Sequence, residues 1–70
     1  MASADLRKRQ RDKEAARMFF QSLNASQRWT LGDQLVSGSV DWLEWGFEKK
    51  PSYAFRNELD YQRMLWEETQ

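Results

Sequence analysis

The residue types that perform most enzyme chemistry are missing from this sequence of 70 residues. There is no histidine, the side chain that most often transfers protons near neutral pH. There is no cysteine either, which excludes a thiolate nucleophile and a sulfur-ligated metal site. Gly32, Gly38 and Gly46 are too widely spaced for a phosphate-binding loop. We therefore expect a protein that is not an enzyme and that has no cofactor, no metal site and no catalytic residues.

Three carboxylates, Asp41, Glu44 and Glu48, are spaced to lie on one side of a helix. Such a row could bind a divalent cation or supply an acid–base pair, but the ligand spacing of a calcium-binding loop does not accompany it. A carboxylate row on a helix is ordinarily a solvated face. Where these acids do have a role, we expect Asp41 and Glu44 to contact a basic partner.

Arg7, Lys8 and Arg11 belong to a basic segment near the N-terminus. Residues 1–24 contain six bases and three acids, a balance of +3, whereas residues 39–70 contain four bases and seven acids, a balance of −3. The bases could follow the phosphates of a nucleic acid, contact a protein, or only solvate the end of a helix. Acids interrupt the basic segment and the formal net charge is zero, which disfavours the nucleic-acid interpretation.

The composition predicts one small folded domain. A chain this short buries only about 60% of its unfolded surface and has room for one core. Charged residues make up 31%, yet four tryptophans, four phenylalanines and two tyrosines supply large buried areas that disordered chains lack. No apolar run approaches the roughly 20 residues that span a bilayer, and no signal-peptide core is present. We expect a cytoplasmic protein with no membrane contact.

Capping and helix-breaking residues divide the chain into helices. Ser26, Ser39 and Ser52 are suited to begin helices, because a serine side chain accepts a hydrogen bond from a free backbone N–H of the first turn. Gly38 is suited to end a helix, since glycine readily adopts the left-handed conformation. Pro51 forbids continuation of the preceding helix. No segment shows the strict alternation that indicates a strand.

The sequence therefore predicts an all-α fold, a small compact bundle of three to four helices. The predicted helices cover residues 4–23, 27–36, 40–48 and 53–67. Ser3 is a candidate cap for the first of them. We expect residues 1–70 to form a single domain. Residues 1–14 should project from it or fray, because their polar helix has nothing to bury.

Apolar stripes in each predicted helix indicate the core. Gly32 is small enough for another helix to approach closely. Trp42 and Trp45 lie nearly opposite the apolar stripe of their helix, so either they complete the core or they form an exposed anchor. The residues we expect in the core are Ala15, Ala16, Met18, Phe19, Phe20, Leu23, Trp29, Leu31, Leu35, Val36, Val40, Leu43, Phe47, Phe55, Leu59 and Trp66.

This surplus of apolar surface predicts a protein that binds another protein, as an adaptor, regulator or inhibitor of the kind that phages and other mobile elements encode. One alternative is a nucleic-acid-binding or transcription-associated factor that uses the basic first helix. Another is a structural homo-oligomer, for example an antiparallel homodimer that pairs the basic and acidic halves. The predicted partner-binding residues are Trp42, Trp45, Asp41, Glu44, Tyr61, Arg7, Lys8 and Arg11.

Overall fold

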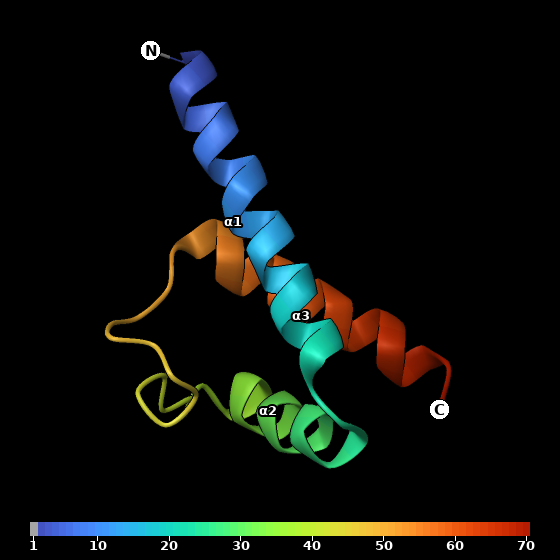
Figure 1. Ribbon diagram of the computed structural model, residues 1–70. Coiled ribbons are helices and arrows are strands. Elements are labelled where there is room, and N and C mark those ends of the chain that lie inside the picture. Colours follow the sequence, from blue (N-terminus) through green and yellow to red (C-terminus); the bar gives the residue numbers. More distant parts are fainter. Residues whose placement is uncertain (1) are drawn as a thin grey trace.

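The computed structural model describes residues 2–70, with side chains from residue 4 onward. These residues form three α-helices and no strand, which confirms the predicted all-α fold (Figure 1). The helices are α1 (Ala2–Ser22), α2 (Ala25–Ser37) and α3 (Tyr53–Glu68). Helix α1 begins before Ser3, whose side chain lies outside the described residues, as does its suggested capping role. None of the described helices has the length and apolarity needed to cross a membrane.

Helices α1 and α3 lie side by side and run in the same direction (Figure 1). At the start of α3, the hydroxyl of Ser52 donates a hydrogen bond of 2.7 Å to the carboxylate of Asp12. Further along both helices, the rings of Phe20 and Trp66 meet edge to face, with centroids 6.2 Å apart. Because the two helices are parallel, the chain must travel back from the end of α1 to the start of α3. Helix α2 and the connection of residues 38–52 make this return.

The core lies between α1 and α3 and is closed from one side by α2. Its buried apolar residues, within the described part of the chain, are Ala16, Phe20, Leu31, Phe55 and Leu59. Partly buried aromatic rings surround this core and enlarge it. A core of this size is small, so the folded state depends strongly on each contact around it.

Helix α3 approaches α2 at Gly32, as the sequence predicts. Gly32 is buried, and a Cβ added to it would lie 3.1 Å from Cδ of Arg63 and 3.4 Å from Oε1 of Glu67. The carboxylates of Asp60 and Glu67 bind the Arg63 guanidinium and so hold the aliphatic part of that side chain over the glycine. The missing side chain at position 32 therefore makes room for an arginine that crosses between the helices.

Helix α2 begins two residues earlier than predicted, because Asn24 and not Ser26 caps it. The Asn24 side chain accepts a bond of 2.8 Å from the backbone N–H of Gln27, and the Gln27 side chain accepts one of 3.0 Å from the backbone N–H of Asn24. Two free donors are satisfied reciprocally in this way. The Asn24–Gln27 spacing was visible in the sequence.

Helix α2 ends at Gly38, as predicted. Gly38 adopts a positive φ of 72°, and its N–H donates to the carbonyl of Leu35 at 3.3 Å. The N–H of Ser39 reaches back to the carbonyl of Gln34 at 3.0 Å. These two bonds satisfy the last carbonyls of α2 and turn the chain back toward α3.

The predicted third helix, residues 40–48, is wrong. Residues 42–46 form one tight turn, in which the N–H of Phe47 donates to the carbonyl of Trp42 at 2.9 Å. Gly46 then adopts a positive φ of 93°, which ends the turn. One helical turn is unfavourable to nucleate, and tertiary contacts of the aromatic rings outweigh the helical pattern here.

Five residues expected in the core are exposed. Leu43 is 74% exposed, because the turn does not place it on the same side as Phe47. Val36 is 73% exposed at the end of α2, and Trp29 is 45% exposed, although its ring packs on that of Trp66 with centroids 4.7 Å apart. Ala15 and Met18 are exposed because the core covers the side of α1 that bears Ala16 and Phe20. These side chains leave more apolar surface uncovered than their helical stripes predict.

The first half of α1 extends beyond the start of α3 (Figure 1). We call residues 4–14 the N-terminal arm. Its residues 4–11 are all exposed, and Asp12 is half-buried beside Ser52. The Cα radius of gyration is 12.4 Å, against about 11 Å expected for a compact chain of this length.

The cap of α2 can be tested by paired substitutions. Asn24→Ala removes the side-chain oxygen that accepts from the backbone N–H of Gln27 and should lower the free energy of unfolding by about 1 kcal/mol. The midpoint of thermal unfolding should fall by about 4–8 °C. Ser26→Ala is the matched control and should change stability by less than about 0.5 kcal/mol. Equal losses for both variants in thermal unfolding followed by circular dichroism would contradict the assignment.

Candidate partner-binding groove

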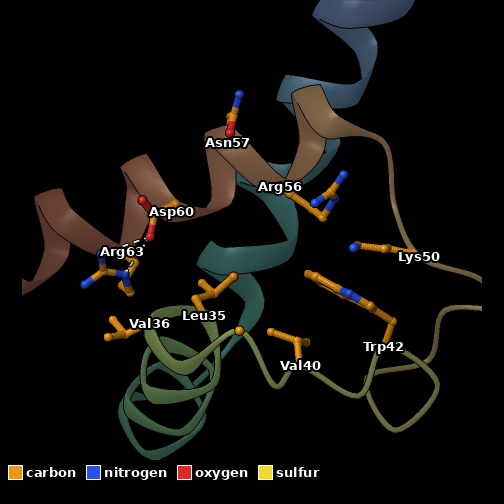
Figure 2. Close-up of a pocket in the computed structure, with 10 residues that line it drawn as sticks. Leu35, Val36, Val40, Trp42, Lys50, Arg56, Asn57, Asp60 and Arg63 are labelled. Carbon is orange, nitrogen blue, oxygen red and sulfur yellow. Dashed lines mark hydrogen bonds and ion pairs between the residues drawn. The ribbon is translucent and has the colours of Figure 1, made fainter.

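A groove opens between the end of α2, the connection that follows it, and the middle of α3. Its volume is about 540 Å³. We call it the Trp42 groove, after the aromatic side chain among its lining residues (Figure 2). The lining residues are Leu35, Val36, Gly38, Val40, Trp42, Lys50, Arg56, Asn57, Asp60 and Arg63.

The floor of the Trp42 groove is apolar. Leu35 and Val36 come from the last turn of α2, and Val40 and Trp42 come from the connection that Gly38 turns back. The Trp42 ring also packs edge to face on Phe47, with centroids 5.6 Å apart. One part of this indole therefore belongs to the core and another part faces the groove.

The rim of the Trp42 groove is cationic. Figure 2 shows Lys50, from the connection, beside the Trp42 side chain, and Arg56, from α3, on the same side of it. Arg56 is fixed by a bond of 3.1 Å from its Nε to the carbonyl of Pro51, and its guanidinium carbon lies 5.4 Å from the centre of the Tyr53 ring. Within residues 4–70, its two Nη groups and the Lys50 ammonium make no hydrogen bond or ion pair. These donors are therefore free to meet an anionic group.

Arg63 is a different kind of cation from Lys50 and Arg56. Its side chain is only 13% exposed, and its Nε and Nη2 donate to Oδ1 of Asp60 at 3.0 and 2.9 Å. Its Nη1 donates to Glu67. Arg63 therefore closes the end of the groove and has little capacity for a further anion.

Two aromatic side chains hold the connection in the shape that forms the groove. The indole N–H of Trp45 donates to Oε1 of Gln34 at 2.9 Å, which ties the connection to α2. The Phe47 ring lies between α1 and α3, with its centroid 5.1 Å from that of Phe19 and 5.3 Å from that of Phe55. Phe47 thus joins the connection to both long helices.

The structure separates the residues predicted to bind a partner into three places. Trp42 lines the groove, whereas Trp45 is half-buried behind it. Asp41 and Glu44 are exposed on the same connection but do not line the groove. Tyr61 is 55% exposed on α3, outside the groove. The remaining three predicted residues, which are exposed on the N-terminal arm, are Arg7, Lys8 and Arg11.

Sequence reasoning missed most of the groove. Val36 is predicted in the core, and Lys50 is not among the predicted binding residues. One signal was available: Arg56 and Arg63 are seven residues apart, which places them on the same face of a helix two turns apart. The approach of Lys50 to this face depends on the path of the connection, which no local pattern specifies.

Metal-ligating side chains are not clustered among the described residues. No group of three His, Cys, Asp or Glu residues that could hold a metal ion occurs among them. The hydroxyls of Ser37 and Ser39 lie 2.6 Å apart, but they are exposed and bond to no base within residues 4–70. What the groove offers is an apolar floor with two free cations. Comparisons of the chain with protein-family models, curated proteins and solved structures found no match.

The anchoring role of Phe47 can be tested against a neighbour on the same turn. Phe47→Ala removes the ring between Phe19 and Phe55 and should lower the free energy of unfolding by about 2–4 kcal/mol. Leu43→Ala should change it by less than about 0.5 kcal/mol, because Leu43 is 74% exposed. Urea unfolding followed by tryptophan fluorescence measures both values. A larger loss for Leu43→Ala would favour the helix predicted over residues 40–48.

Proposed function

We propose that this protein is a non-enzymatic module that binds a segment of another protein in the Trp42 groove. The observation that supports this proposal most is the arrangement of two free cations, Lys50 and Arg56, over an apolar floor that the fold leaves open. Apolar surface left uncovered on a small protein usually marks an interaction site, and tryptophan is a frequent interface anchor.

The chemistry of the groove indicates the chemistry of the bound segment. Val36, Val40 and Trp42 offer contact to an apolar side chain. Lys50 and Arg56 are placed to bind a carboxylate beside that side chain, and an arginine with two free Nη groups can do so in a bidentate manner. The partner segment therefore carries an acidic residue next to an apolar one.

The small size of the core also supports the proposal that this protein binds a partner, because apolar side chains remain uncovered. Large apolar side chains remain exposed on all three helices, including Met18, Val36 and Tyr53. A partner that covers part of this surface adds apolar burial that the chain alone does not achieve. Binding would therefore raise the stability of the folded state as well as form a complex. The absence of cysteine suits a reducing compartment, and we place this activity in the cytoplasm.

Adjacent lysines provide a matched test of the groove. Lys50→Glu places a negative charge where the partner carboxylate would bind, and recovery of the partner should fall at least about tenfold. Lys49→Glu makes the same change of charge one residue away, outside the groove, and should leave recovery within about twofold of the unmodified protein. The measurement is affinity capture from the source cell with quantitative mass spectrometry.

A second pair of variants tests the apolar floor. Val36→Asp introduces a charge on the floor and should remove the same captured protein that Lys50→Glu removes. Met18→Asp is the control, since Met18 is 64% exposed on α1 and lies outside the groove. Capture of the same proteins by all four variants would contradict the proposal, provided that circular dichroism shows the variants to be folded.

A further inference from the structure

The acids of the N-terminal arm lie toward α3 or form an ion pair within α1. Asp5 and Asp12 both line a hollow of about 900 Å³ between the arm and the start of α3, where Asp12 accepts the bond from Ser52. Glu14 pairs with Arg17 at 3.1 Å. The acids that interrupt the basic segment in the sequence are therefore turned toward α3 or already paired.

Two cations of the arm lie away from these acids. Arg7 and Arg11 are one helical turn apart and do not line the hollow, whereas the neighbouring Lys8 lines it together with Asp5 and Asp12. All three are exposed, and within residues 4–70 none of them forms an ion pair. We call Arg7, Lys8 and Arg11 the arm cations.

The connection between α2 and α3 carries the opposite charge. Asp41, Glu44 and Glu48 are exposed, and none forms an ion pair in the described part of the chain. By contrast, Glu58 and Asp60 each pair with an arginine. We call Asp41, Glu44 and Glu48 the loop acids.

The arm cations do not reach the loop acids of the same chain. Figure 1 shows the arm extending away from the connection, on the other side of the start of α3. A second copy, related by a two-fold axis, can bring each arm to the connection of the other copy, and the complementary contact then forms twice. The formal net charge of zero, with 11 bases and 11 acids, allows such pairing without excess charge.

An apolar side chain beside the arm cations would be covered by the same contact. Leu6, which is 58% exposed, lines a second hollow together with Arg7 and Arg11. Its burial would add an apolar contribution that charge pairing alone does not supply, because exposed ion pairs contribute little.

We propose that a second copy of this chain is the partner of the arm, and that the arm cations of each copy bind the loop acids of the other. These residues and the Trp42 groove have no residue in common, so the proposal stands independently of the proposed function. A nucleic acid fits the arm less well, because the loop acids on the same neutral molecule would repel it.

Charge exchange between two variants tests the pairing directly. Arg7→Glu with Arg11→Glu reverses the arm, and Asp41→Lys with Glu44→Lys reverses the connection. In sedimentation equilibrium at about 0.05 M salt, the unmodified protein should form dimers, and each variant alone should dissociate at least about tenfold more readily. An equimolar mixture of the two variants should recover the dimer, since both of its contacts again join opposite charges.

The dependence of the dimer on salt and a control charge reversal provide two further tests. Raising the salt to about 1 M should dissociate the unmodified dimer, because the Debye length falls to about 3 Å. Asp33→Lys with Glu68→Lys changes two exposed acids elsewhere and should leave the dimer intact. Circular dichroism establishes that each variant is folded. A monomeric unmodified protein at low salt overturns the proposal, whether or not it binds an added DNA duplex, and so does a mixture that stays monomeric.

Discussion

The contact of the Phe47 ring with Phe19 and Phe55 is the interaction on which the rest of the structure depends. The buried core is small, and α1 and α3 run parallel, so the chain between them must be held by something other than a short turn. Phe47 lies within 5.1–5.3 Å of a ring from each long helix and holds the connection against both of them. Aromatic rings suit this role because each buries a large area in a defined geometry.

The Trp42 groove is a consequence of that anchoring. With Phe47 fixed, the turn of residues 42–46 presents the Trp42 ring toward the end of α2, and Lys50 is carried to the face of α3 that bears Arg56. The same turn leaves the loop acids in solvent on the outside of the molecule. The connection of residues 38–52 thus supplies an apolar wall, a free cation and an acidic surface.

Local chemistry in the sequence was enough to predict the three helices that form, but it also predicted one over residues 40–48 that does not form, and it did not predict the groove. Gly38 and Ser52 mark helix ends through hydrogen bonds to nearby backbone, so their roles could be predicted. Asn24 acts in the same local way and was overlooked in favour of Ser26. The apolar spacing of residues 40–48 matched a helix, yet Gly46 and the packing of Phe47 produced a single turn. The groove joins side chains that meet only through that turn, and no local pattern contains this information.

Photo-crosslinking can detect a partner protein in the Trp42 groove directly. A photo-crosslinking amino acid is placed at position 36, on the floor of the groove, or at position 18 on α1. Both native side chains are exposed, 73% at Val36 and 64% at Met18, so the change should preserve the fold. Irradiation in the source cell should give a defined adduct from position 36 and none from position 18. The same adduct from both positions, or an adduct from position 18 alone, would contradict the binding of a partner in the groove.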